Sequence, residues 1–252
     1  MTERDLFDAV LVALVAAGGL TFVILLFLVA PYGRHLRRGF GPLVNGTAGW
    51  VLMESTAALV PPATFLLAGA RPGPVPWVFL ALWEIHYLYR AFVYPFRRKA
   101  AGEMPALVVA MGMAFNLANG WANAAWLSHL GPPLGPGWLA DPRFLVGLGL
   151  FAAGLAVNHH SDQVLLDLRA RGERGYAVPG RGLHRLVASP NYLGELVEWT
   201  GFAVLTWSPA AAVFVFWTAA NLVPRALANL RWYRRTFPDY PRQRRALIPY
   251  LL

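Results

Sequence analysis

The chain of 252 residues contains no cysteine, which excludes disulfides, cysteine-ligated zinc, iron–sulfur clusters and thiol nucleophiles. Charged residues make up only 14% of the sequence, whereas about 25% is usual for a soluble domain. The sequence also lacks a G-x-G-x-x-G turn after a strand, a Walker loop, an H-E-x-x-H motif and a nucleophile elbow. These absences argue against a water-soluble domain and against the common soluble nucleotide-binding and hydrolase folds.

Hydrophobic residues, in contrast, make up 57% of the chain, and 10 Trp, 9 Tyr and 15 Phe are among them. The mean hydropathy is +0.44. A chain this apolar cannot stay solvated, so intrinsic disorder is excluded. The first apolar run, 6–30, is too long for a signal-peptide core and no small-x-small cleavage pattern follows it, so we expect it to be a retained first span. The sequence predicts an integral membrane protein.

Helices that cross a bilayer need about 20 predominantly apolar residues. We expect seven of them, at 6–30, 43–68, 76–96, 105–129, 143–168, 191–207 and 209–230. Turn-forming Gly and Pro residues separate most of these runs, and the boundary between the last two is the narrowest, at Ser208-Pro209. The expected fold is therefore an all-α integral membrane protein with one domain, 1–252.

The positive charges predict an orientation for these spans. The net charge is +9, and most of the 22 Lys and Arg residues follow the first, third, fifth and seventh expected spans. Basic clusters between apolar runs favour the membrane surface over nucleic acid as the partner. By the positive-inside rule the C-terminus is cytoplasmic and the N-terminus lies outside, which requires an odd number of spans.

Ionisable residues within spans are costly, so each is a functional candidate. Glu54 has no charged residue near it in the sequence; it is either a buried hydrogen-bonded carboxyl or a neutral donor to a ligand oxygen. In the third span, helical spacing places Glu84, Tyr87 and Tyr94 on one face, with His86 and Arg90 on an adjacent strip. An interfacial aromatic belt is the alternative for the tyrosines. Asn116, Asn119 and Asn123 form a stripe that either joins helices or contacts a ligand.

Three further polar faces occur near the expected cytoplasmic ends of the last spans. They comprise Asn158, Asp162 and Arg169; Asn191, Glu195 and Glu198; and Arg225, Asn229 and Tyr233. Beside arginine-rich segments, such faces suit a large anionic ligand that enters from the cytosol, although interhelical salt bridges would produce the same pattern. We expect no metal at His159-His160-Ser161-Asp162, because adjacent histidines diverge on a helix.

Longer motifs extend this pattern over nearly the whole chain after the first span. They are His160-Ser161-Asp162, Gly172-Glu173, Tyr176, Gly182-Leu183, Asn191-Tyr192-Leu193-Gly194-Glu195, Glu198-Trp199, Pro224-Arg225-Ala226, Tyr240-Pro241 and Ala246-Leu247-Ile248-Pro249-Tyr250, with Trp50, Glu54, His86-Tyr87, Arg90 and Phe92-Val93-Tyr94 upstream. In these motifs the chain closely resembles the steroid 5α-reductase family and looks like a bacterial member.

The resemblance implies a seven-helix membrane reductase that uses NADPH to reduce 3-oxo-Δ4 steroids. It implies that Glu54 and Tyr87 meet the substrate carbonyl. The implied cofactor contacts are Asn158, Asp162, Arg169, Tyr176, Asn191, Glu195, Arg225 and Tyr233, with Trp50, Arg90 and Tyr94 as weaker ones. Met53, Asn229 and Ala177 stand where animal members have Gln, His and Arg. We expect a multi-pass monomer in the bacterial inner (cytoplasmic) membrane that takes a steroid or related enone lipid from the bilayer and binds neither nucleic acid nor metal.

In the implied reaction, hydride reaches C5 of the steroid and a proton reaches C4, giving a 3-oxo-5α-steroid. Two alternative functions differ from this reaction in the residues that they require. A membrane S-adenosylmethionine-dependent methyltransferase of the isoprenylcysteine type shares an Asn-Tyr-x-Gly-Glu-like stretch, but a methyl acceptor needs no carbonyl donors such as Glu54 and Tyr87. A non-catalytic lipid transporter would not need three polar faces at one side of the membrane.

Overall fold

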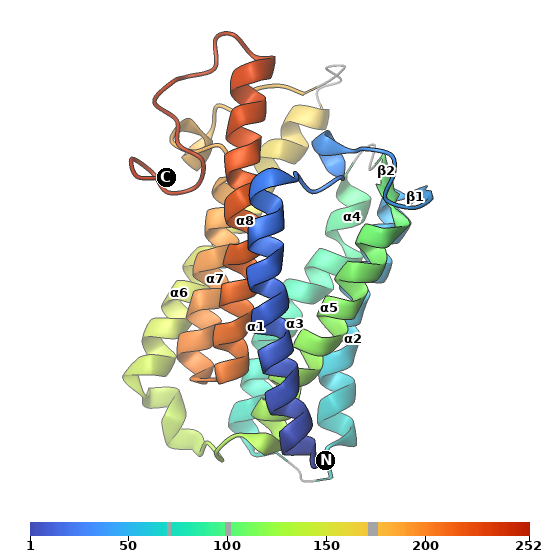
Figure 1. Cartoon of the computed structure of the whole chain (residues 1–252). Coiled ribbons are helices and arrows are strands. Elements are labelled where there is room, and N and C mark those ends of the chain that lie inside the picture. The colour runs from blue at the N-terminus through green and yellow to red at the C-terminus, as the bar shows by residue number, and fades with distance from the viewer. Residues whose placement is uncertain (70–71, 99–101, 171–175) are drawn as a thin grey trace.

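A computed structural model describes residues 1–69, 72–98, 102–170 and 176–252, without the side chains of 169 and 170. In these ranges each expected apolar run forms a long helix, and the seven helices stand side by side (Figure 1). They are α1 (Glu3–Phe27), α2 (Gly46–Leu67), α3 (Pro74–Phe92), α5 (Ala106–Ala125), α6 (Pro142–Ala170), α7 (Pro190–Thr206) and α8 (Pro209–Thr236). Among the described residues, α1, α2, α6 (over Pro142–Leu168) and α8 are long and apolar enough to cross a membrane. The long helices and their apolar composition thus confirm an all-α membrane protein.

Short elements join the long helices. They are the 3₁₀ turns η1 (Gly33–His35), η3 (Pro136–Ala140) and η4 (Gly182–Arg185), the π-helical turn η2 (Trp126–Leu130), and the strands β1 (Leu43–Asn45) and β2 (Glu103–Pro105). The strands were not expected. They pair antiparallel, with Leu43 opposite Pro105, and so join the starts of α2 and α5. The Asn45 side chain then caps α2 by accepting hydrogen bonds from the amides of Thr47 and Ala48, both at 3.0 Å.

Two helix boundaries follow from local chemistry. The expected third span, 76–96, divides at Val93 into α3 and α4 (Tyr94–Arg97). Pro95 explains the break, because it has no amide hydrogen and its ring clashes with the carbonyl four residues earlier. Between α7 and α8 the chain turns at Trp207, whose φ of 49° is left-handed, and the Ser208 hydroxyl accepts from the Ala211 amide at 3.3 Å.

The helices pack in pairs, α6 on α7, α2 on α5 and α1 on α8. The α6–α7 contact is unusually close because glycines face one another across it. A Cβ on Gly147 would lie 2.7 Å from the Gly201 carbonyl oxygen, and one on Gly154 would lie 2.6 Å from that of Gly194. Small residues let membrane helices approach to backbone contact. This pairing fixes the polar residues of α6 against those of α7.

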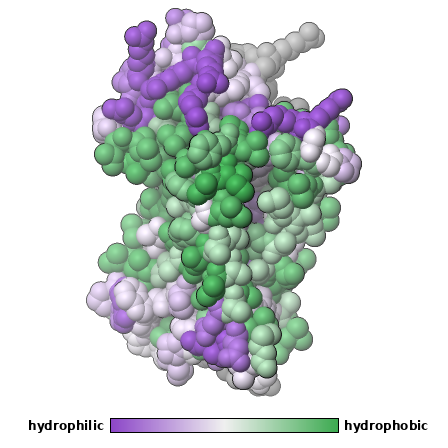
Figure 2. All heavy atoms as spheres, in the orientation of Figure 1, coloured by the Kyte–Doolittle hydropathy of each residue, from purple (hydrophilic) through white to green (hydrophobic). Residues whose placement is uncertain are grey.

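On the face of the molecule that Figure 2 shows, hydrophilic residues gather at the two ends. Figure 2 shows an apolar surface between a strongly hydrophilic upper end and a smaller hydrophilic patch below. The connection from α1 to α2, residues 176–189 and the segment after α8 lie at the upper end together with α4, and the N-terminus lies at the lower end (Figure 1). The arginine-rich segments therefore share one end of the helix bundle.

Candidate active site

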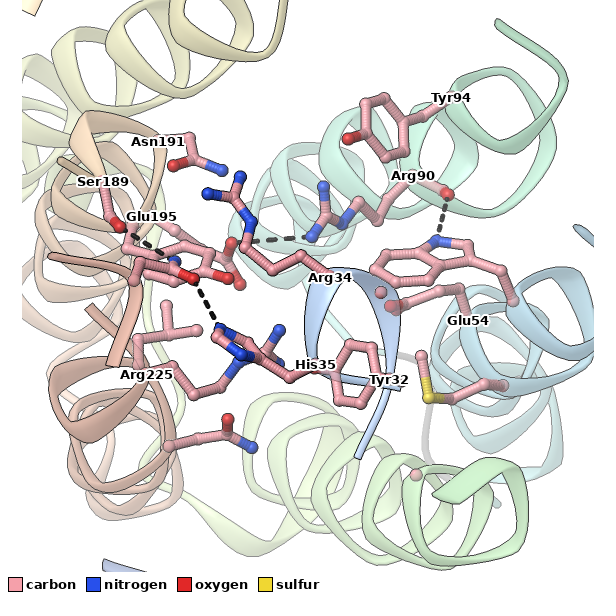
Figure 3. Close-up of a pocket in the computed structure, with 18 of the residues that line it drawn as sticks. Tyr32, Arg34, His35, Glu54, Arg90, Tyr94, Ser189, Asn191, Glu195 and Arg225 are labelled. Carbon is pink, nitrogen blue, oxygen red and sulfur yellow. Dashed lines mark hydrogen bonds and ion pairs between the residues drawn. The ribbon is translucent and has the colours of Figure 1, made fainter. Parts of the chain in front are cut away.

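A cavity of about 560 Å³ opens between the helices, and the connection from α1 to α2 lines part of it (Figure 3). This volume is typical of small-molecule sites. Nine of the 13 expected catalytic and cofactor-binding residues line it, namely Trp50, Glu54, Tyr87, Arg90, Tyr94, Tyr176, Asn191, Glu195 and Arg225. Residues as far apart in the chain as Trp50 and Arg225 thus surround one space.

The two expected carbonyl donors reach this cavity from different helices, Glu54 from α2 and Tyr87 from α3. The Tyr87 ring is 4% exposed and packs against two indoles, with its centroid 4.9 Å from that of Trp83 and 5.5 Å from that of Trp199. The two indoles also contact each other, with centroids 5.2 Å apart, so the three rings form one cluster that limits rotation of the phenol. The Tyr87 hydroxyl is therefore held in a fixed position at the cavity.

Glu54 is less isolated than its sequence surroundings indicated. The fold brings Arg90 of α3 and Glu195 of α7 close enough to interact electrostatically with the Glu54 carboxyl. The sequence could not reveal this neighbourhood, because it depends on which helices adjoin. Glu84, which helical spacing placed on the face of Tyr87, is absent from the described residues that line the cavity.

Arg90 of α3 contacts residues of four other helices, α2, α4, α6 and α7, at the wall of the cavity. Its guanidinium lies 3.3 Å from the Asp162 carboxylate and 3.8 Å from that of Glu195. The same guanidinium lies over the Trp50 ring at 4.9 Å and the Tyr94 ring at 5.0 Å. The Trp50 indole donates to the Arg90 carbonyl at 3.2 Å. The polar faces thus form interhelical ion pairs and also line the cavity, so the two interpretations of the sequence pattern are compatible.

Three of the implied cofactor contacts lie behind the lining residues. Asn158 donates to the Asn191 carbonyl at 3.0 Å, and Asn191 in turn donates to Asp162 at 3.0 Å. Tyr233 is 2% exposed and stacks on Tyr240 with centroids 5.1 Å apart. These side chains support neighbours that face the cavity. The side chain of Arg169 and the Gly172-Glu173 motif lie outside the described residues.

Arg225 and Asn229, one turn apart on α8, have different surroundings. The Arg225 guanidinium lies over the rings of Tyr32 (4.1 Å) and Tyr192 (5.5 Å), and within the described part of the chain no carboxylate forms an ion pair with it. Asn229 donates to the Ser189 hydroxyl at 3.1 Å and accepts from the His35 imidazole at 3.2 Å. Arg225 thus remains available to an anion, whereas Asn229 holds the α1–α2 connection in place.

Other polar residues of the spans have structural partners. His86 and Glu198, both buried, lie 2.8 Å apart through Nδ1 and Oε1 and join α3 to α7. Asn123 donates to the Asn119 side-chain oxygen at 3.1 Å within α5. Asn116 donates to the Met53 carbonyl at 2.8 Å and also lines the cavity. Asn116 therefore joins α5 to α2 and borders the cavity, whereas the hydrogen bond between Asn123 and Asn119 lies within α5.

Sequence reasoning missed the contribution of the α1–α2 connection. Tyr32, Arg34 and His35 line the cavity, and Figure 3 shows them reaching into it. The sequence did mark this segment by its basic cluster, but that cluster was used only to predict the orientation of the spans. Burial lowers the pKa of the His35 imidazole, which favours the neutral form that donates to Asn229.

Comparison with known proteins identifies the family. Residues 102–252 match the family model described as 3-oxo-5-alpha-steroid 4-dehydrogenase. The chain is 37% identical to steroid 5-alpha-reductase DET2 of Arabidopsis thaliana over 258 residues, which covers 100% of this chain and 98% of the relative. It is 38% identical to 3-oxo-5-alpha-steroid 4-dehydrogenase 1 of Macaca fascicularis over 87% of this chain and 84% of the relative. It is 37% identical to the Homo sapiens protein of that name over 87% and 85%. The resemblance in the motifs is confirmed: the chain belongs to the 3-oxo-5-alpha-steroid 4-dehydrogenase family of oxidoreductases, which act on CH–CH bonds.

Proposed function

We propose that this protein reduces the Δ4 double bond of 3-oxo-Δ4 steroids with NADPH and releases 3-oxo-5α-steroids. The observation that carries the proposal is the placement of Glu54 and Tyr87, from two helices, in one cavity that arginines also line. Two hydrogen-bond donors suit a ketone oxygen, and arginines suit the phosphates of a dinucleotide. Family membership supports the same substrate class.

The residues present fit a phosphate-bearing cofactor. Arg225 is a cation at the cavity whose guanidinium lies against tyrosine rings and, within the described residues, has no acidic partner. Leaving such a charge without a partner is unfavourable, so an anion is the natural complement. The residues that would hold NADPH are Trp50, Arg90, Tyr94, Tyr176, Asn191, Glu195 and Arg225, with Asn158, Asp162 and Tyr233 behind them and Arg169 assigned from the sequence alone. When bound, NADPH supplies the hydride that reaches C5.

Glu54 and Tyr87 activate the steroid for this reduction. An enone accepts hydride poorly until its carbonyl oxygen is stabilised as negative charge develops on it. The Tyr87 hydroxyl and a protonated Glu54 each donate a hydrogen bond to that oxygen, and in other enzymes one such donor contributes roughly 10²–10³ in rate. The resulting steroid enolate takes a proton at C4. The surrounding indoles and apolar helix faces exclude water, which strengthens both hydrogen bonds.

The same proposal places the molecule in a membrane. We infer a single domain, 1–252, with seven spans, the N-terminus outside and the C-terminus in the cytoplasm. The shared position of the arginine-rich segments at one end supports this orientation. The cofactor then arrives from the cytosol and the steroid enters laterally from the bilayer. The chain acts as a monomer in the bacterial inner (cytoplasmic) membrane.

Binding and product analysis on purified protein in nanodiscs test this function. We expect NADPH to bind and S-adenosylmethionine not to bind, and a deuteride-labelled NADPH to deliver deuterium to C5 of a 3-oxo-Δ4 steroid. Glu54→Ala should abolish turnover, while the matched variant Glu84→Ala, at a carboxyl absent from the cavity lining, should retain it. Binding of S-adenosylmethionine alone would support the methyltransferase alternative, and steroid binding without turnover would support a transporter.

A further inference from the structure

Arg34 lies in an aromatic cage at the outer end of the cavity. Its guanidinium carbon is 5.2 Å from the ring centroid of Tyr176, 4.8 Å from that of Trp232 and 4.7 Å from that of Tyr233. Aromatic faces attract the cation but accept no strong hydrogen bond from its N–H groups. The cage therefore holds the guanidinium in place and leaves its hydrogen-bond donors free.

One of these donors lacks an acceptor. The Nη1 atom of Arg34 is buried and has no hydrogen-bond partner, and no acidic side chain in the described ranges forms an ion pair with Arg34. A buried charged donor without an acceptor is costly, and native structures rarely contain one. Because Arg34 also lines the cavity, an anionic group of the ligand is the acceptor that the site lacks.

The position of Arg34 along the bundle indicates which anionic group that is. Tyr233, beneath Arg34, lies eight residues beyond Arg225 on α8, which is about 12 Å farther along the helix axis. The two arginines therefore serve different groups of one extended ligand. Arg225, which comes earlier on α8 and lies over the Tyr32 and Tyr192 rings, suits the pyrophosphate. Arg34 lies at the far end, where the adenosine of a dinucleotide must be when its nicotinamide is near the substrate.

Tyr176 supports an adenosine at this end. Its side chain is 45% exposed and lines the cavity beside Arg34, so part of its ring is free to stack on a base. We propose that Arg34 binds the 2′-phosphate on the adenosine ribose and thereby determines the preference for NADPH over NADH. This inference rests on the proposed function, since it assigns a residue to the cofactor named there.

The α1–α2 connection is built to hold Arg34 in this position. Gly33 has a φ of +63°, a left-handed conformation that favours glycine. On the other side of Arg34, His35 donates to Asn229 at 3.2 Å, and Asn229 donates to Ser189 at 3.1 Å. Arg34 is thus fixed between a tight turn and a hydrogen-bonded anchor, which lowers the entropy cost of binding a phosphate.

Equilibrium binding of NADPH and of NADH to the purified full-length chain tests this inference without relying on activity. Arg34→Met should raise the Kd for NADPH by about 10-fold to 100-fold, the loss expected for one charge-assisted contact, and change the Kd for NADH by less than about twofold. Arg34→Lys should lie in between, because it keeps the charge but not the guanidinium geometry. Adenosine 2′,5′-bisphosphate should compete with NADPH in the wild type and lose this ability in Arg34→Met.

Arg37→Met is the matched control. Arg37 belongs to the same connection, donates to the Val29 carbonyl at 2.7 Å and is absent from the described cavity lining, so both Kd values should stay unchanged. Equal losses for NADPH and NADH in the Arg34 variants, or no loss for either, would overturn the inference while leaving the proposed function intact. A wild-type protein that binds neither nucleotide would overturn both. If Arg34→Met does not fold, Arg34→Lys carries the same comparison.

Discussion

The tyrosines of α3 differ in where their hydroxyl groups lie. Tyr87 lines the cavity, whereas the Tyr89 hydroxyl accepts a hydrogen bond from Arg97 at 2.7 Å and Tyr89 is absent from the described lining. In the ground state a ketone oxygen is a weak acceptor, so the Tyr87 hydroxyl contributes little to steroid affinity. As hydride arrives, the oxygen gains charge and the same hydrogen bond strengthens.

Tyr87→Phe should therefore lower kcat by roughly 10²–10³ while KM for the steroid stays nearly unchanged. Phe keeps the ring, so its packing on Trp83 and Trp199 and the thermal unfolding midpoint should hardly change. Tyr89→Phe is the control and should keep normal turnover. The measurement that tests this role is kcat per NADPH-binding molecule. Near-normal turnover in Tyr87→Phe would remove this hydroxyl from the mechanism.

At the residue scale, the sequence indicated which side chains line the cavity better than it indicated which residues they contact. Glu54 and Tyr87 stood out because a polar group in an apolar span has few reasons to be there. That Arg90 lies near Glu54 and pairs with Asp162 and Glu195 depends on helix neighbours, which periodicity within one helix cannot give. Arg34 was overlooked because a loop arginine has an ordinary explanation in membrane topology.

At the scale of elements, the α6–α7 contact determines whether the polar faces meet. A Cβ on Gly154 would lie 2.2 Å from the Glu198 amide nitrogen, whereas one on Gly149 of the same helix would meet nothing within 4 Å. Helix propensity alone favours alanine over glycine at both positions by about 1 kcal/mol. Substitution by alanine should therefore destabilise the protein at Gly154 and be neutral or slightly stabilising at Gly149.

Gly154→Ala should lower the thermal unfolding midpoint and weaken NADPH binding, because α6 and α7 must separate to admit the methyl group. Gly149→Ala should leave the midpoint unchanged or raise it slightly. Differential scanning fluorimetry in detergent measures both. A midpoint for Gly154→Ala at or above that of the wild type would show that the close approach of these helices is not needed for stability.

A second element-scale prediction concerns η4, which joins the end of α6 to α7. The His184 side chain is 1% exposed and its Nε2 lies 3.2 Å from the Ser161 carbonyl of α6. Burial, with Arg244 and Arg34 nearby, lowers the pKa of His184 to about 4. An unfolded histidine titrates near 6.5, so between these values only the unfolded chain binds the proton. Stability is full above pH 6.5 and falls as the pH drops towards 4.

Acidification from pH 6.5 to 4 should thus cost the wild type on the order of 3 kcal/mol through this one group. His184→Gln keeps a donor for the Ser161 carbonyl but cannot titrate, so its unfolding midpoint should fall less over the same pH interval. Parallel pH profiles for the two proteins would contradict this role of His184, whatever other groups contribute to the common slope.

The sequence predicted the long helices well and the short elements poorly. Runs of about 20 apolar residues are a strong signal, and each one formed a helix at nearly the expected position. The three-residue strands β1 and β2 have no periodicity to detect, and their pairing joins segments about 60 residues apart. The break at Val93 did have a signal, Pro95, but an apolar run continued past it and made one span the simpler interpretation.

At the scale of the whole molecule, the two ends differ in charge. The upper end in Figure 1 carries most of the arginines that the structure describes, and the lower end carries η3 and the N-terminus. If the arginine-rich end is cytoplasmic, Arg34 and Tyr176 face the compartment that supplies NADPH. The orientation of the chain therefore decides from which side the cofactor enters. Because the chain contains no cysteine, single introduced cysteines can be used to measure this orientation.

A single introduced cysteine is then the only thiol for a membrane-impermeant maleimide. Gly137 in η3 has open space around its Cα, and Gln243 is exposed after α8 at the opposite end. In bacterial cells with a permeable outer membrane, Gly137→Cys should be labelled directly and Gln243→Cys only after the inner membrane is opened. Both variants should keep wild-type NADPH binding, which shows that labelling reports the folded protein. The reverse labelling would place the arginine-rich end outside, away from the nucleotide pool, and labelling of both thiols in intact cells would contradict a membrane-crossing bundle with its two ends on opposite sides.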